Sequence, residues 1–146
     1  MIRDFLEANK LEGRVFSFPS DTSIEKAAEE AHLSVDSIAK AFLFIDEKMD
    51  FFAVIALLGS KISSKEACSL FKKKFLEEAD SEQILKFAGF EENFFPPVSV
   101  FGVRVVLHSS VKNRKSLLFA LSNREFLLIN TEDILKANAD VEEILD

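Results

Sequence analysis

The sequence has no tryptophan, no tyrosine and a single cysteine, Cys68. One cysteine excludes an intrachain disulfide, so we expect a reducing compartment, the cytoplasm. Because tryptophan and tyrosine are absent, the 16 phenylalanines must supply the aromatic packing. Apolar residues make up 48% of the 146 residues, which is enough to build the core of one domain.

Long apolar runs and an apolar leader are also missing. The polar segment 46–50 interrupts the longest apolar stretch, so no run reaches the roughly 20 residues of a membrane-spanning helix. The first ten residues, MIRDFLEANK, lack the apolar core of a signal peptide. We therefore expect neither a secretion signal nor a membrane partner.

Common metal, nucleotide and nucleophile motifs are absent too. The two histidines and the cysteine lie far apart and do not have the spacing of zinc ligands. The chain has no G-x-S-x-G, no P-loop and no G-x-G-x-x-G motif. The sequence therefore predicts neither a metal site nor a cofactor.

The net charge of −7 argues against a protein that coats nucleic acids with a broad basic surface. It remains compatible with a protein that grips only the end of a nucleic acid. Two short basic groups could make such contacts: Lys72–Lys74, and Lys112 with Arg114 and Lys115. Lys72–Lys74 is also consistent with the solvent-exposed C-terminal end of a helix, because cations there interact favourably with the helix dipole.

The stretch from Ile38 to Gly59 organises the chain. Two apolar runs, Ala41–Ile45 and Phe51–Leu58, flank a short polar turn, which is typical of a β-hairpin. Alternate residues of a strand share a face, and both faces of this hairpin are apolar. We therefore expect it to be central and covered on both sides. Lys40 enters this core at the head of the first run, where a charge is costly without water or a partner.

Capping residues and apolar periodicity predict the other elements. Thr22 to Glu25 and Ser63 to Glu66 both have the capping-box pattern of a helix start. Helices are expected at 2–11, Thr22–Ala31, Ser63–Phe75, Asp80–Ala88 and 131–137, and strands at Arg14–Phe18, Leu76–Ala79, Val100–His108, Ser116–Leu121 and Glu125–Ile129, with a loop at 90–99 and an acidic tail at 139–146. Hairpins without strict βαβ alternation favour an α+β or mixed-barrel fold.

The order of these signals resembles a known family. An alanine-rich helix precedes I-A-K-A-F-L-F, and a second apolar strand then ends in glycine. An Ala-Asp-x-Glu helix, a G-F-x-x-x-x-x-P-P loop and a final L-x-I-x-x-x-D-I-L follow. From about Val15 to Asn138, the chain is similar to the YbaK and prolyl-tRNA-synthetase editing domains, which are trans-editing aminoacyl-tRNA deacylases.

This resemblance implies a fold and an activity. The fold would be α+β, a mixed barrel-like β-sheet with flanking helices, formed by 1–146 as a single editing domain. The activity would be hydrolysis, in trans, of the ester of a mischarged tRNA, often tRNA(Pro) carrying alanine or cysteine. The partners would be the tRNA acceptor end and, as a further candidate, an aminoacyl-tRNA synthetase.

The resemblance also assigns site residues. Lys40 falls on the family's characteristic lysine, and Asn93 begins the segment that matches its G-x-x-x-P loop up to Pro97. These two positions, Lys40 and Asn93, are the expected catalytic residues. The expected substrate-binding positions are Gly59, Gly89, Phe94, Pro97 and His108.

Several of these positions depart from the family pattern. Asn93 and Phe94 stand where glycines are expected, and asparagine tolerates a positive φ well enough to preserve such a turn. Phe94 is bulky and could fill the pocket. His108 stands where the family often has aspartate, and Ser122-Asn123 replaces a late Ala-Gly pair.

Each candidate has a functional and a structural interpretation. Lys40 either steadies charge on the ester carbonyl or extends to solvent from a strand end. The 93–97 loop is either a cradle of backbone N–H groups or a stiff connection. In the functional interpretation Phe94 stacks on the terminal base or lines the pocket, and in the structural one it anchors the loop in the core. His108 is either a general base or a strand-end residue with a satisfied hydrogen bond.

Three functions remain open at the level of sequence. The first is a deacylase that uses position and electrostatics rather than a side-chain nucleophile. The second is a family member whose altered loop has closed the site, leaving a module that binds tRNA or a synthetase. The third is a hydrolase of an unrelated small ester. An open cleft with Lys40 in its wall would favour the first, and a cleft plugged by Phe94 the second.

Overall fold

The computed structural model describes residues 13–97 and 103–137. The expected helix at 2–11, the first residues of the expected strand Val100–His108 and the acidic tail lie outside these residues. The described elements are β1 (Arg14–Ser17), α2 (Ile24–Glu30), η1 (Val35–Ser37), β2 (Ala39–Ile45), β3 (Phe51–Leu57), α3 (Ser64–Phe71), β4 (Glu77–Glu78), α4 (Ser81–Ala88), η2 (Glu92–Phe94), β5 (Arg104–Leu107), η3 (Ser109–Val111), β6 (Ser116–Ala120), β7 (Glu125–Asn130) and α5 (Thr131–Ala137), where η marks a 3₁₀-helix.

The strands form two sheets. The smaller has the order β1-β7-β6 and the larger the order β4-β2-β3-β5. All pairs are antiparallel except β3 with β5, so the larger sheet is mixed. An isolated bridge between Ile38 and Leu118 connects the two sheets at the start of β2. The α+β class is therefore confirmed, but the sheets do not close into a barrel.

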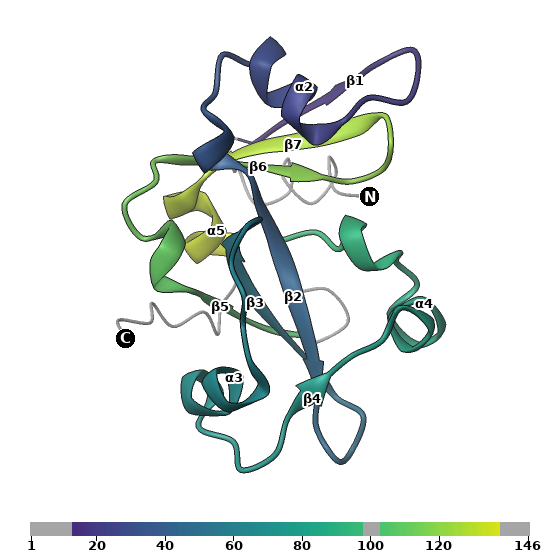
Figure 1. The fold of residues 1–146 in the computed structure, drawn as a ribbon, viewed down its shortest axis with the longest axis vertical. Coiled ribbons are helices and arrows are strands. Elements are labelled where there is room, and N and C mark those ends of the chain that lie inside the picture. The colour runs from purple at the N-terminus through teal and green to yellow at the C-terminus, as the bar shows by residue number, and fades with distance from the viewer. Residues whose placement is uncertain (1–12, 98–102, 138–146) are drawn as a thin grey trace.

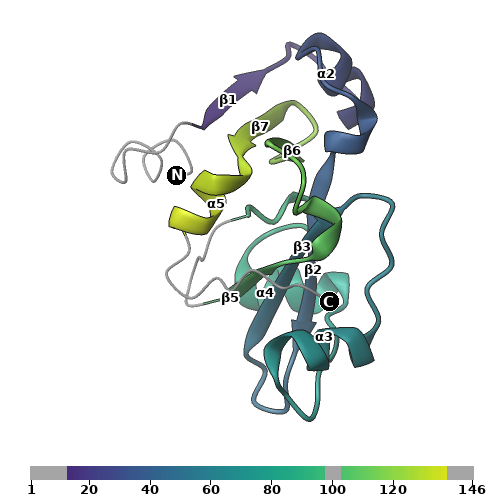
Figure 2. The same cartoon turned by 90° about the vertical axis from the view of Figure 1, so that its left-hand side faces the viewer.

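The β2–β3 hairpin is central and buried on both faces, as the sequence predicts. One face contributes Ala39, Ala41, Leu43 and Ile45 to a core cluster with β5, β6 and β7. The opposite face contributes Phe44, Phe52 and Val54 to a second cluster beneath α3. In both views α2 and the small sheet lie at one end of the molecule and α3 at the other (Figure 1, Figure 2). Lys40, near the start of β2, therefore lies toward the small sheet.

Two helix boundaries differ from the predictions. Ser23, not Thr22, caps α2, and its hydroxyl accepts the Lys26 N–H at 3.2 Å. The helix expected to run to about Phe75 ends at Phe71, because Lys72 adopts a left-handed conformation with φ of 56°. No glycine marks this stop, so the sequence offered no signal for it. The capping box at Asp80 and Gln83 is fully formed.

The early end of α3 turns Lys73 toward Asp46 at the hairpin tip. The Asp46 carboxylate is buried and lies 3.2 Å from the Lys73 ammonium. It also accepts the N–H groups of Lys48 and Asp50. Burial by itself raises the pKa of Asp46, but these hydrogen bonds and the Lys73 charge outweigh it and hold the pKa below its ordinary value. The contact therefore fixes both the hairpin turn and the segment after α3.

We expect Asp46→Asn to lower the free energy of unfolding by about 1–3 kcal/mol at neutral pH, because the amide keeps an acceptor but loses the charge. Since the folded-state pKa lies below the ordinary 3.8, the carboxylate stabilises the fold above about pH 4 and loses this effect as the pH falls toward the folded-state pKa. Urea unfolding from pH 7 to 3 measures both effects. Asp50→Asn, at an exposed position of the same turn, is the control. A stability difference that stays constant across this pH range would contradict the assignment.

Candidate active site

A cavity of about 350 Å³ opens where the two sheets meet. The start of β2, the 3₁₀-helix η2, the beginning of α2 and the turn between β6 and β7 form its walls. Its lining residues are Thr22, Ser23, Ile24, Ala39, Lys40, Leu58, Asn93, Phe94, Ala120, Ser122, Asn123 and Phe126. The cavity thus brings together three of the predicted site residues, Lys40, Asn93 and Phe94.

Lys40 is the only charged residue of this lining set. Its ammonium donates to the Asn93 side-chain oxygen at 3.3 Å and lies 4.9 Å from the centre of the Phe42 ring. Among the described residues no carboxylate forms an ion pair with it. An ammonium has three donors, so it retains hydrogen-bonding capacity toward the cavity. The site therefore presents an uncompensated positive charge, held in place by an amide and an aromatic face.

Asn93 and Phe94 belong to the 3₁₀-helix η2. Asn93 does not have the positive φ that its place in the loop led us to expect, and it contacts Lys40 through its side chain instead. The Phe94 N–H donates to Glu91 O at 3.0 Å, so this donor is used within the turn. Phe94 itself is half-buried and forms part of the cavity wall, whereas Phe95 is buried and packs edge-on against Phe90. Of the two phenylalanines, Phe95 anchors the loop.

Two segments of the wall come from distant parts of the sequence. The Thr22 N–H donates to Asn123 O at 2.9 Å, and the Arg124 side chain donates to Asp21 at 3.0 Å. These bonds hold the start of α2 against the β6–β7 turn. Sequence analysis identified Ser122-Asn123 through the family resemblance but did not identify the Thr22–Ile24 wall. The capping pattern there was visible, but nothing local indicated a contact about 100 residues away.

The cavity contains hydroxyl groups but no activated nucleophile. The Thr22 hydroxyl donates to Ser20 O, the Ser23 hydroxyl caps α2, and the Ser122 hydroxyl accepts two backbone N–H groups of the turn. Among the described residues that line this cavity, no histidine or carboxylate is present to act as their base. The arrangement can therefore stabilise negative charge on a bound group.

The remaining predicted residues lie outside this cavity. Gly59 follows Leu58, which does line it, and a side chain at either Gly59 or Gly89 would meet no atom within 4 Å. Gly89 ends α4 with φ of 77°, a conformation that favours glycine. Pro97 is buried and does not line the cavity. Their assignment as substrate-binding residues stays a prediction.

His108 lines a different cavity, formed with residues of η3 and α5. Its Nδ1 accepts the Ser110 N–H at 3.1 Å, so the neutral ring carries its proton on Nε2, which donates to Glu66 at 3.0 Å. Both ring nitrogens are thus used within the fold. Sequence analysis found no partner for His108, because Glu66 was expected to complete the helix cap at Ser63. Ser63 does accept the Glu66 N–H, while the Glu66 carboxylate turns to His108.

The described residues contain neither a metal-binding group of side chains nor a membrane-spanning helix. No group of three or more histidine, cysteine, aspartate or glutamate side chains there could hold a metal ion. None of the described helices has the length and apolar character needed to cross a membrane.

Residues 19–137 match the profile of a family described as the aminoacyl-tRNA editing domain. The match spans most of the chain and includes every residue that lines the Lys40 cavity. A search of curated protein sequences finds no match.

Solved structures share the fold at low sequence identity. A hypothetical protein has a TM-score of 0.83 at 17% identity, with 97% of each chain covered. A candidate trans-editing enzyme for prolyl-tRNA synthetase has a TM-score of 0.79 at 18% identity, covering 99% of this chain and 94% of the other. A scaffold protein used for computational epitope grafting has a TM-score of 0.79 at 17% identity with the same coverage. At these identities, the likeness shows the fold alone.

We expect Glu66 and His108 to stabilise each other. A double-mutant cycle with Glu66→Ala and His108→Ala should give a coupling energy of about 0.5–1 kcal/mol at neutral pH, typical of a partly buried pair. Chemical denaturation of the four proteins measures it. Purely additive effects of the two substitutions would show that the contact does not hold α3 to the end of β5.

Proposed function

Because the chain belongs to the aminoacyl-tRNA editing domain family, we propose that it hydrolyses the ester of a mischarged tRNA in trans, with the Lys40 cavity as its active site. The observation that carries this proposal is that Lys40 lies in the wall of an open cavity, paired with Asn93 rather than with a carboxylate. Phe94 lines this cavity and leaves about 350 Å³ open. The proposal includes a single domain that acts in the cytoplasm.

The reaction follows from the charge at the site. A water molecule attacks the carbonyl carbon of the aminoacyl ester, and negative charge develops on the carbonyl oxygen. The Lys40 ammonium stabilises this oxyanion, while Asn93 holds the ammonium in position. The bond to the ribose oxygen then breaks, the oxygen takes up a proton, and the free amino acid leaves. The substrate's own ribose hydroxyl or amine orients the attacking water, which fits a cavity without a side-chain base.

The size of the cavity favours a small amino acid. About 350 Å³ must hold the amino acid and part of the terminal ribose, and the apolar wall of Ala39, Ala120 and Phe126 suits a short side chain. A structural neighbour is a candidate trans-editing enzyme for prolyl-tRNA synthetase. We therefore propose alanine or cysteine on a tRNA(Pro)-type molecule as the substrate, with a larger cognate amino acid excluded by size, as in double-sieve editing.

A module that only binds tRNA or a synthetase is the second candidate. The 3₁₀ turn at η2 uses the Phe94 N–H internally, so the loop offers one backbone donor fewer to an oxyanion. This candidate would replace the first if folded protein turns over no charged tRNA.

We expect Lys40→Ala to reduce deacylation of the preferred mischarged tRNA by about 100- to 1,000-fold, since it removes the charge that stabilises the oxyanion. Asn93→Ala should cost less, roughly tenfold, because Lys40 stays charged but loses its positioning contact. Release of radiolabelled alanine, cysteine, serine and threonine from their tRNAs measures both effects. Lys48→Ala, at an exposed position of the hairpin tip, is the matched control. Full activity of folded Lys40→Ala would contradict the assignment of the Lys40 cavity as the active site.

Phe94 should set the upper size limit of the substrate. We expect Phe94→Ala to raise kcat/KM for larger amino acids by roughly tenfold relative to kcat/KM for alanine, because loss of the phenyl ring widens the cavity. The same charged tRNAs, with valine and proline added, provide the measurement. Phe87→Ala truncates an exposed phenylalanine outside the cavity and serves as the control. An unchanged preference would mean that another wall limits the substrate.

A further inference from the structure

The chain carries two groups of three neighbouring basic residues, and the structure separates them. Lys72–Lys74 follows α3, whereas Lys112, Arg114 and Lys115 lie between η3 and β6. Figure 1 shows α3 at the end of the molecule farthest from α2, where the hairpin has its tip. The second group lies toward the opposite end of the hairpin, which is also the end that carries Lys40.

Within the Lys72–Lys74 group, Lys73 is neutralised locally. The Lys73 ammonium pairs with the buried Asp46 carboxylate at 3.2 Å and lies 5.5 Å from the Phe52 ring. Glu77 and Glu78 of β4 are exposed directly after this group. Asp46 also lies six residues beyond Lys40 along the hairpin, which is about 20 Å of strand. This group therefore has a structural use and lies far from the site.

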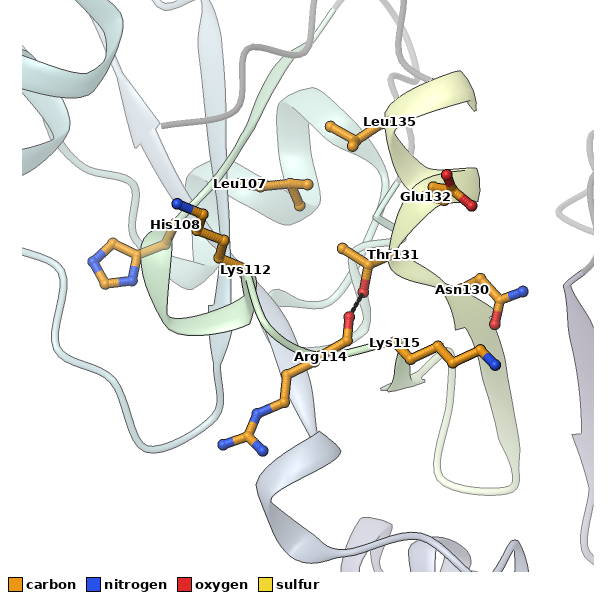
Figure 3. A pocket seen from close by; sticks show the side chains of 9 residues that line it. All are labelled: Leu107, His108, Lys112, Arg114, Lys115, Asn130, Thr131, Glu132 and Leu135. Atoms are coloured by element: carbon orange, nitrogen blue, oxygen red, sulfur yellow. Dashed lines mark hydrogen bonds between the residues drawn. The ribbon is translucent and has the colours of Figure 1, made fainter. Parts of the chain in front are cut away.

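Lys112, Arg114 and Lys115 are not engaged in this way. Lys112 and Lys115 are exposed, and within the described residues none of the three side chains forms an ion pair. They border a cavity of about 290 Å³ that is also lined by Leu107, Leu135 and the carboxylate-bearing Glu132 (Figure 3). Thr131 holds the loop itself, because its hydroxyl donates to the Arg114 carbonyl group and its N–H donates to the Lys115 carbonyl group. Three basic side chains thus project from a loop whose backbone is held in place by hydrogen bonds.

The 3₁₀-helix η3, which precedes this loop, is linked through the end of β3 to the wall of the Lys40 cavity. Leu57 donates its N–H to the Ser110 hydroxyl at 3.2 Å, and the next residue, Leu58, lines the cavity. Leu58 in turn donates its N–H to Ile38 O at 2.9 Å, two residues before Lys40. A short hydrogen-bonded path therefore joins η3, the end of β3 and the start of β2. The basic loop and the Lys40 cavity belong to the same end of the hairpin.

We propose that Lys112, Arg114 and Lys115 bind backbone phosphates of the tRNA acceptor stem while the aminoacylated end occupies the Lys40 cavity. This inference rests on the proposed function. It would explain how a chain with net charge −7 can hold an RNA: the cations that touch phosphates are confined to one loop, while acidic residues outnumber basic ones in the rest of the chain. Contacts of this kind carry no base specificity and position the substrate.

The test compares two matched triple variants. The first is Lys112→Gln, Arg114→Gln and Lys115→Gln, which removes the proposed contacts. The second is Lys65→Gln, Lys72→Gln and Lys74→Gln, which removes the same charge from exposed positions around α3 and spares Lys73. Each is assayed on full-length mischarged tRNA and on a short aminoacylated trinucleotide that lacks the stem.

We expect the first triple variant to lose about tenfold or more in kcat/KM on full-length tRNA at low salt, and its salt slope to fall by about 2 to 3. Its activity on the trinucleotide should equal that of the wild type, and the control variant should match the wild type on both substrates. An unchanged rate and salt slope on full-length tRNA would overturn the proposal. So would an equal loss on the trinucleotide, because the loop would then act on the site itself.

Binding of uncharged tRNA separates this proposal from the proposed function. If the wild type hydrolyses neither substrate, the function fails, yet binding of uncharged tRNA still reports the stem contact. Weaker binding by the first triple variant than by the control would support the stem contact without catalysis. Undetectable binding by the wild type, or equal binding by both variants, would overturn it.

Discussion

The structure depends on one constraint, the burial of the β2–β3 hairpin on both faces. One face packs against β6 and β7 of the smaller sheet, and the other packs beneath α3. A strand buried on both sides has little freedom to shift, because a slip by one residue would exchange its two faces. The core therefore fixes the backbone of Lys40, while the Lys40 ammonium reaches the cavity where the two sheets meet.

The two ends of this hairpin have different electrostatics. At the tip, Asp46 and Lys73 compensate each other in a largely buried contact that stabilises the fold. At the start, the Lys40 ammonium contacts the Asn93 amide and the Phe42 ring, and no described carboxylate pairs with it. The three free cations of the Lys112–Lys115 loop lie at this same end. An acidic chain can thus present a local positive field where the proposed substrate enters.

Much of the fold and the main candidate residue could be predicted from local patterns. Two apolar runs around a polar turn revealed the hairpin, the Asp80–Gln83 capping box revealed α4, and the isolated charge at the head of an apolar run pointed to Lys40. The end of α3 at Lys72, the Thr22–Ile24 wall and the Glu66 contact of His108 were not predictable in this way. Each is accompanied by a contact with a residue more than 25 positions away, which local sequence patterns do not reveal.

A structure with a non-hydrolysable alanyl-adenosine, in which an amide replaces the ester, tests the central claim most directly. Our account predicts that the alanyl carbonyl oxygen lies within hydrogen-bonding distance of the Lys40 ammonium, with Asn93 and Phe94 beside the bound group. A ligand bound in the cavity beside His108 and Lys112, or one that leaves Lys40 without a contact, would contradict it.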